Sequence, residues 1–555
     1  MGHSRAVTAT FCATLFLVVF VACGAEERGN PTSSTDIPAQ TDFSTETTAG
    51  QGARAEAASR PNILWVVWDT VRADRMSVYG YPRPTTPKLE AWATKARIFE
   101  NVVSTASSTV PSHAAMFTGL IPSEHGANNG HRWLDAGHFT VAERLSEAGY
   151  QTFLWAANPH LTKEENFQQG FDVEHHPWDP ETLKEAIRIV TRKAEGDRSA
   201  TSESRLKSAK EVQPWATKSA GELAERKLLE WLSEADAQRP WFAFVNYMEA
   251  HWPSIPSRKA RKKMMSDQDV ILSYKVDRSW IPMWSYVFGV HEYTEVQLEI
   301  MASTYDATLT ELDLLFDHLL GALEAQGALE NTVIILTADH GEHLGEHHML
   351  DHQYALYRPL VNVPLIIHYP EGIEAGRDAS PVMNFDLFPT VLELAGVDSS
   401  LADGHASKAQ SLLRPASDRQ RMSQYPAVFT NPFKAVKKRN PDWDSAPWHS
   451  RLYALQEGKF KIICGKESGP ELYDVVADPR EEIDTAKADP DRVYAMSEAL
   501  HEFLASTRAY VSEDGDEVEM TPEHRERLEA LGYVISGAES EETQAVFSST
   551  PCAPL

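Results

Sequence analysis

Cysteine is scarce in this chain, with four among 555 residues, at positions 12, 23, 464 and 552. Two of the four, Cys12 and Cys23, fall in an N-terminal segment that has the features of a targeting signal. So few thiols exclude a disulfide framework. They are also too few to supply the ligands of a zinc-thiolate site.

Basic residues are fewer than acidic residues. The chain has 52 Lys and Arg residues against 80 Asp and Glu residues, a formal net charge of -28. A general basic surface is therefore not expected, and we predict no nucleic-acid partner. We interpret the acidity as a contribution to solubility. An apolar content of 42% and a charged content of 24% fit a globular protein, and the length allows a large core, two domains and tails.

The N-terminus lacks an apolar run long enough to span a membrane. Phe11 to Val21 is apolar but too short for a comfortable span, and Arg5 precedes it. The tetrapeptide Phe20-Val-Ala-Cys23 then resembles a bacterial lipoprotein cleavage box. We predict a signal peptide over residues 1–23 and an exported lipoprotein, periplasmic or on the outer membrane, that meets the membrane only through a lipid on Cys23. Simple secretion is the alternative.

Two strongly apolar segments, far apart in the sequence, each end in an acid. Asn62-Ile-Leu-Trp-Val-Val-Trp68 precedes Asp69, and the β-branched run Val333 to Leu336 leads to Asp339-His340. Such runs predict fully buried strands. In open parallel sheets, ligands bind at the carboxyl ends of the strands. A strand-ending Asp is often a helix cap, but two at the same end favour a shared site.

Strand and helix signals alternate from Arg60 onward, which predicts an α/β fold with a large central, mostly parallel sheet between helices. After about residue 425, short strand-like pieces near 427, 452, 461 and 471 predict a smaller C-terminal α+β subdomain. We expect a flexible linker over 24–59, a catalytic domain over 60–425, the subdomain over 426–536 and a loose tail over 537–555. The expected elements of the catalytic domain include helices at 133–149, 220–232 (with capping-box spacing at Ser219 and Glu222) and 301–327, and strands at 152–156 and 241–247.

Between the two acidic strands lies Ser108-Thr109-Val-Pro111-Ser-His113, followed by Gly119. This segment resembles the signature of the sulfatase family, within the alkaline phosphatase superfamily. Further matching pieces follow in the expected order, so that the resemblance runs from about residue 60 to 535: Asp69 to Asp74, Thr337 to Glu342, Leu344 to His347, Val363 to Ile366 and Glu471 to Asp474. The family implies an α/β sandwich with a large central sheet and a smaller C-terminal domain.

One departure from the family pattern decides the chemistry. Sulfatases carry a cysteine or serine two residues before the proline, oxidised to formylglycine, where this chain has Thr109. We therefore expect no formylglycine. His113 replaces the usual arginine, and Asp339-His340 replaces the usual Asp-Asn pair. These changes resemble superfamily members that use an unmodified threonine and one transition-type metal, among them some phosphoglycerol and phosphoethanolamine transferases.

The same residues predict a metal-assisted nucleophile. Asp69, Asp339 and His340 supply two carboxylates and an imidazole, with the Thr109 hydroxyl as fourth ligand. This mixed set favours zinc or manganese, with calcium or magnesium as alternatives. Thr109 precedes a proline that suits the first turn of a helix, where backbone N–H groups attract an anion. A bound metal activates a hydroxyl. The alternative role for Thr109 is a helix N-cap.

Four further residues are candidates for substrate binding. His251 follows the strand at 241–247, where the family has a sulfate-binding histidine. Asn158 and His160 follow the strand at 152–156, where the family has a Lys-x-His pair. His352 falls where another substrate-binding lysine is common. The histidine-rich stretch 342–348 suggests a second metal, but the sequence does not identify the carboxylates that such a site needs.

These observations support a sulfatase-family ester hydrolase of the bacterial envelope, cleaving phosphate mono- or diesters or phosphonates through Thr109, with His113 also in the catalytic machinery. The substrate is a small-molecule, glycan or lipid-headgroup ester. Three alternatives stay open: a sulfuric ester hydrolase without formylglycine, a phosphoglycerol- or phosphoethanolamine-type transferase, and an inactive binding protein. Retention of Asp69, Asp339 and His340 weighs against the last.

Overall fold

The centre of the molecule is an eight-stranded sheet of order β11-β2-β10-β7-β1-β6-β4-β5. The structure is a computed structural model that describes residues 60–194, 217–400, 407–465, 469–511, 521–530 and 552. Five neighbouring strands run parallel, and β10 runs antiparallel between β7 and β2. The strand bounds are β1 Asn62–Trp68, β2 Arg97–Phe99, β4 Gln151–Ala156, β5 Val173–His175, β6 Trp241–Tyr247, β7 Thr332–Thr337, β10 Leu365–His368 and β11 Gly376–Asp378. The predicted fold class is confirmed.

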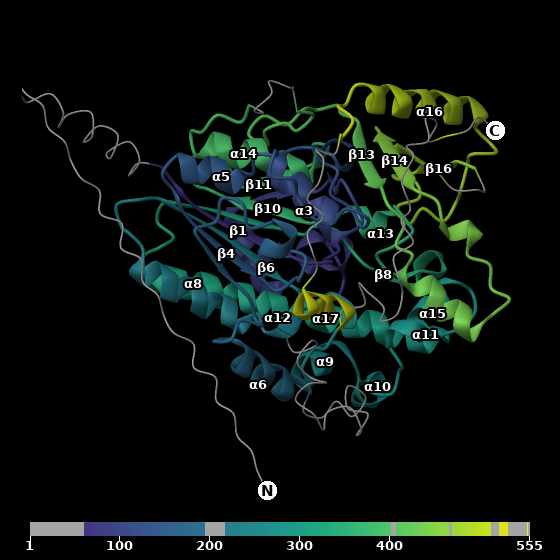
Figure 1. Ribbon diagram of the computed structural model, residues 1–555, viewed down its shortest axis with the longest axis horizontal. Coiled ribbons are helices and arrows are strands. Elements are labelled where there is room, and N and C mark those ends of the chain that lie inside the picture. Colours follow the sequence, from purple (N-terminus) through teal and green to yellow (C-terminus); the bar gives the residue numbers. More distant parts are fainter. Residues whose placement is uncertain are drawn as a thin grey trace, which may run out of the picture. The chain divides into compact units, whose positions relative to one another are not determined.

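Helices cover both faces of this sheet. Figure 1 shows α3, α5 and α14 on one side of the strands and α8 and α12 on the other. The inner strands β7, β1, β6 and β4 are almost fully buried, which explains their largely apolar sequences. The helix bounds are α2 Pro87–Trp92, α3 Thr109–Thr118, α4 Pro122–His125, α5 Val141–Glu147, α6 Leu183–Ala194, α8 Glu222–Glu234, α9 Arg258–Met264, α10 Asp267–Ser273, α11 Trp280–Val287, α12 Glu295–Ala325, α13 Arg358–Val361, α14 Leu387–Leu394, α15 Asn431–Arg439, α16 Pro490–Ala505 and α17 Pro522–Ala530.

Three helices begin at other residues than predicted. The helix expected from residue 133 begins at Val141, because Thr140 forms a capping box with Glu143 there. The capping box expected at Ser219 does not form. Helix α8 begins at Glu222 without a side-chain cap, and the Gly221 N–H instead donates to Glu249 Oε1 at 2.9 Å. The long helix expected at 301–327 is α12, whose first turn lies earlier than expected.

A second, antiparallel sheet of order β13-β14-β15-β16 lies toward the C-terminus, with α16 packed against it. Its strands are Arg421–Tyr425, Leu452–Glu457, Phe460–Cys464 and Glu471–Asp474. The strand expected near 427 is therefore wrong in position. Pro426 ends β13, since proline has no N–H for the ladder, and β13 itself is mostly polar in sequence although all five residues are buried.

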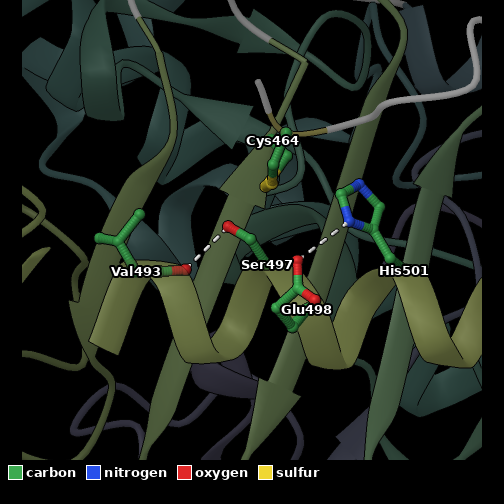
Figure 2. The surroundings of a disulfide bond; sticks show 6 residues. Cys464, Val493, Ser497, Glu498 and His501 are labelled. Atoms are coloured by element: carbon green, nitrogen blue, oxygen red, sulfur yellow. Dashed lines mark hydrogen bonds and ion pairs between the residues drawn. A yellow bond between two sulfur atoms is a disulfide. The ribbon is translucent and has the colours of Figure 1, made fainter. Parts of the chain in front are cut away.

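In the described part of the chain, one disulfide joins Cys464, the last residue of β15, to Cys552, with 5.1 Å between their Cα atoms. Figure 2 shows the bond above α16, near Val493 and Ser497. The scarcity of cysteine argued against a disulfide framework and did not predict this bond, which fixes a residue of the predicted loose tail. The two cysteines are 88 residues apart, and no local pattern pairs them.

The predicted signal peptide, the whole predicted linker and all of the predicted tail except Cys552 lie outside the described residues. Among the helices that are described, none has both the length and the apolarity that a membrane crossing requires.

Candidate active site and metal centre

Four parallel strands present polar residues at one edge of the large sheet. They are neighbours in the order β7-β1-β6-β4, and their carboxyl ends are nearly level, with Val67 opposite Thr337 and Ala156 opposite Asn246. The predicted ligands Asp69 and Asp339 follow β1 and β7 at this edge. Convergence of the two acids thus follows directly from strand adjacency.

Helix α3 brings Thr109 to the same edge. The helix begins at Thr109, with Ser108 as N-cap, and ends at Gly119, whose φ of 69° favours glycine. The alternative role of Thr109 as N-cap is therefore excluded. Its hydroxyl lies 3.4 Å from His340 Nε2 and 3.3 Å from Asn158 Nδ2.

In Asp339, one carboxylate oxygen is held and the other is left for a ligand. Oδ1 accepts from the backbone N–H groups of Thr70 at 3.1 Å and His340 at 2.8 Å. Oδ2 has no hydrogen-bond partner among the described residues, although the side chain is fully buried. A buried bare carboxylate oxygen is costly unless a cation or donor meets it.

Asp69 repeats this arrangement. Its Oδ2 accepts from Asn158 Nδ2 at 2.8 Å and Asn246 Nδ2 at 3.3 Å. Its Oδ1 is buried without a partner in the described part of the chain. The His340 ring is oriented to match, because its Nδ1 lies 3.0 Å from the Gly341 carbonyl and donates to it, which leaves Nε2 as the ligand nitrogen.

These atoms have the spacing of a metal site. Asp69, Asp339 and His340 each offer one ligand atom, and these three atoms lie within 4.8 Å of one another. His340 Nε2 is 3.3 Å from Asp339 Oδ2 and 3.4 Å from Thr109 Oγ1. Tetrahedral ligands bonded at about 2.1 Å are about 3.4 Å apart. The residues present therefore fit a divalent ion.

The electrostatics of the site agree with this fit. Burial raises the pKa of Asp69 well above its usual range, and the adjacent Asp339 carboxylate raises it further. Burial also lowers the pKa of His340, which keeps the ring neutral, the form that binds metals. A divalent ion between two such carboxylates would offset both their repulsion and their desolvation.

His113 lies one helical turn beyond Thr109, fully buried against Phe117 and Phe244. Its Nδ1 is 3.0 Å from the Thr109 carbonyl and 3.5 Å from Asp339 Oδ2. These contacts join α3 to a predicted metal ligand, so His113 is placed to orient Asp339 and the start of the helix.

The four predicted substrate-binding residues gather in the same region, and all are buried. Asn158 contacts both Asp69 and the Thr109 hydroxyl. His160 is held by Glu165 Oε2 at 2.7 Å from its Nδ1. The ring centre of His352 is 4.5 Å from that of His340 and 5.2 Å from that of His251.

Sequence reasoning missed several residues of the site. Asn246 could have been found, because it is a polar residue near the end of an apolar strand. No such sequence feature marks Ser104, Ser112 and Asn384. The hydroxyls of Ser104 and Ser112 donate to the Asp339 carbonyl, at 2.5 and 2.7 Å, and Asn384 Nδ2 donates to both hydroxyls. This network fixes α3 against the end of β7.

The carboxylates that the sequence did not supply for a second metal are also present. Glu342 and Asp351 lie with His352 in a second buried cluster of possible ligands. Although burial lowers it, the Asp351 and Glu342 carboxylates raise the pKa of His352 well above its usual range.

Comparison with known proteins agrees with this geometry. The family model described as Sulfatase matches residues 61–397, more than half of the 555 residues. A second model, described as N-sulphoglucosamine sulphohydrolase, C-terminal, matches residues 345–509.

Among curated relatives, the N-acetylglucosamine-6-O-sulfatase of Bacteroides thetaiotaomicron is 25% identical over 500 residues, covering 77% of this chain and 82% of the relative. Among solved structures, the phosphonate monoester hydrolase of Agrobacterium radiobacter has a TM-score of 0.59 at 21% identity, covering 80% of this chain and 95% of that chain. The phosphonate monoester hydrolase from Silicibacter pomeroyi has a TM-score of 0.60 at 18% identity, covering 81% and 96%.

Proposed function

Since the chain belongs to the sulfatase family and is an ester hydrolase, we propose that it cleaves phosphate mono- or diesters, or phosphonate esters, with Thr109 as the nucleophile. One observation carries the proposal. The Thr109 hydroxyl faces the nitrogen of His340 that is available to a metal, at 3.4 Å, at the first residue of α3.

The threonine at position 109 favours phosphorus esters over sulfate esters as substrates. A threonine cannot give the formylglycine aldehyde, whereas its hydroxyl can attack phosphorus directly. The fold itself permits both chemistries, because similar structures include phosphonate monoester hydrolases while the curated relatives are sulfatases. The choice therefore depends on this chain's own residues.

In the proposed reaction the Thr109 oxygen forms a bond to phosphorus, and the bond from phosphorus to the alcohol oxygen breaks. The hydroxyl proton leaves with the alcohol, and a phosphothreonine remains. Water then attacks phosphorus, the bond to Thr109 breaks, and the hydroxyl is restored. The N–H groups at the start of α3 would face the anionic oxygens of the ester.

Asp69, Asp339, His340 and Thr109 would hold a divalent ion, zinc or manganese in preference to calcium or magnesium. When bound, the ion lowers the pKa of the hydroxyl and polarises an oxygen of the ester. Asn158 donates to both Asp69 and Thr109, and so would fix the nucleophile relative to this ligand set. His160 and His251 are left to contact the ester, while His352 faces the carboxylates of Glu342 and Asp351.

The second candidate function is sulfuric ester hydrolysis, favoured by the sulfatase relatives. A panel of aryl phosphate monoesters, phosphodiesters, phosphonates and sulfates separates the two. Metal-stripped protein is assayed with zinc, manganese and calcium in turn, and alcohol acceptors are added to detect transfer. We expect phosphorus esters to be cleaved fastest, with zinc or manganese. A strong preference for sulfates would contradict the proposal, and no turnover of any ester would favour a binding protein.

We also propose that the protein is exported and anchored by a lipid on Cys23. The lipoprotein-like box supports this, and so does the Cys464–Cys552 disulfide, because such bonds persist in oxidising compartments and are rare in the cytosol.

A further inference from the structure

A second cluster of possible metal ligands lies directly beside the first. Glu342 follows the loop that carries Asp339 and His340, Asp351 ends the short strand β9 (Leu350–Asp351), and His352 follows it. All three residues are at most 2% exposed. Buried carboxylates and histidines without a nearby cation are expensive, so their grouping needs an explanation.

The cluster has the spacing of a coordination site. Each of the three residues offers one ligand atom, and these three atoms lie within 4.8 Å of one another. His352 Nδ1 is 3.7 Å from Glu342 Oε1 and is in closer contact with Asp351 Oδ1. The first of these distances is near the separation of about 3.4 Å between tetrahedral ligands.

A second observation, independent of the spacing, is that some of these buried atoms have no hydrogen-bond partner. Glu342 Oε2 accepts from the Trp252 N–H at 3.3 Å, but Oε1 has no hydrogen-bond partner among the described residues. His352 Nε2 has none either in that part of the chain, whereas its Nδ1 faces the Asp351 and Glu342 carboxylates. Asp69 and Asp339 show the same division between a held oxygen and a bare one, so the two clusters are built alike.

We propose that Glu342, Asp351 and His352 bind a second divalent cation, zinc or manganese, beside the one held by Asp69, Asp339 and His340. The ring centres of His352 and His340 are 4.5 Å apart, so the two ligand sets lie side by side. Paired ions of this kind commonly clamp the attacking and leaving oxygens of a phosphoryl group. The catalytic role rests on the proposed function, whereas the binding itself does not. The rival occupant is a proton on His352, shared with the two carboxylates.

Metal content distinguishes the two occupants. The full chain is stripped, reloaded with zinc and dialysed, and its zinc content is measured by mass spectrometry. We expect two ions per wild-type chain and one in Glu342→Gln and in Asp351→Asn, with Asp339→Asn also losing one. The matched control is Asp179→Asn, in the partly exposed cluster of His175, Asp179 and Glu181, which should keep both.

Anomalous scattering from wild-type crystals provides a test that needs no variant to fold. Two peaks, one against each ligand set, would support the proposal. One ion per wild-type chain, or full zinc content in both Glu342→Gln and Asp351→Asn, would overturn it. These readouts do not depend on substrate choice: a chain with two ions that prefers sulfates would contradict the proposed function and leave this inference standing.

Discussion

At the scale of single residues, the environment of the Thr109 hydroxyl decides its chemistry. The hydroxyl is buried and faces a histidine nitrogen and an amide rather than solvent. Its position at the start of α3 is set by Pro111 in the first turn and by Gly119 at the end. A threonine at the start of a solvent-exposed helix would have no such neighbours, so burial among predicted metal ligands is what supports the proposal that Thr109 is the nucleophile.

Replacing Thr109 tests this directly. Thr109→Ala should lower kcat/KM for phosphorus esters by at least about a thousandfold, because the attacking oxygen is gone. Thr109→Ser keeps a hydroxyl and should stay within about tenfold of wild type. Acid-quenched wild type should carry a phosphoryl group on the peptide that contains Thr109. The assignment is falsified if Thr109→Ala turns over these esters at the wild-type rate.

Gly341 helps to fix the orientation of the His340 ring. A Cβ at this position would lie 2.0 Å from the Pro359 carbonyl oxygen, which is backbone and cannot swing away, and 2.9 Å from Arg72 Cγ. The Gly341 carbonyl also accepts from His340 Nδ1. Gly341→Ala should therefore destabilise the fold by about 1–3 kcal/mol and reduce bound zinc.

The matched control for Gly341 is Gly321→Ala. Gly321 lies inside α12, and a Cβ there meets nothing within 4 Å. This change should raise stability by about 0.5–1 kcal/mol. Chemical denaturation of both variants, followed by metal analysis, checks the pair. Equal stability of the two would show that the close approach at Gly341 relaxes at no cost.

At the scale of elements, the sequence predicts best where local pattern and burial agree. The strands β1 and β7 are apolar except at their end residues, and α3 has a proline in its first turn and a glycine after its last. These strands and this helix were therefore predicted together with the site residues that they position. β13 was misplaced because its residues are polar although buried. Asp351 was missed because its partners Glu342 and His352 come from a histidine-rich loop whose path has no periodicity.

The disulfide is an element-scale feature whose contribution can be measured. It closes a loop of 88 residues from the end of β15, and bonds of this kind contribute about 2–4 kcal/mol, mostly by restricting the unfolded chain. Cys552→Ser should lower the free energy of unfolding by that amount. Reduced wild type should match the variant. Identical denaturation curves for the oxidised wild type and Cys552→Ser would rule out a stabilising bond.

At the scale of the whole molecule, the order of strands creates the site. The ligands come from loops after β1 and β7 and from α3, and only the adjacency of these strands brings them together. The family resemblance implied that these strands are neighbours, which no local sequence pattern reveals. The sulfatase prediction is confirmed by the family match. The choice between phosphorus and sulfur stays a prediction, because the fold is compatible with both.

Export and anchoring at Cys23 is the prediction that involves the whole chain. Arg5, the short apolar segment and the box ending at Cys23 motivate it, and the disulfide at Cys464 requires an oxidising compartment to persist. Mass spectrometry of protein extracted from membranes should show a diacylated or triacylated N-terminus beginning at Cys23. Cys23→Ser should shift the protein out of the membrane fraction, with ester hydrolysis unchanged because the site lies far along the chain. A mature wild-type protein that begins at another residue, carries no lipid and stays in the soluble fraction would contradict the anchor. If that soluble protein nevertheless contained the Cys464–Cys552 bond, export by simple secretion would remain supported. The bond tests whether the protein reaches an oxidising compartment, and the lipid tests whether the protein is anchored to a membrane.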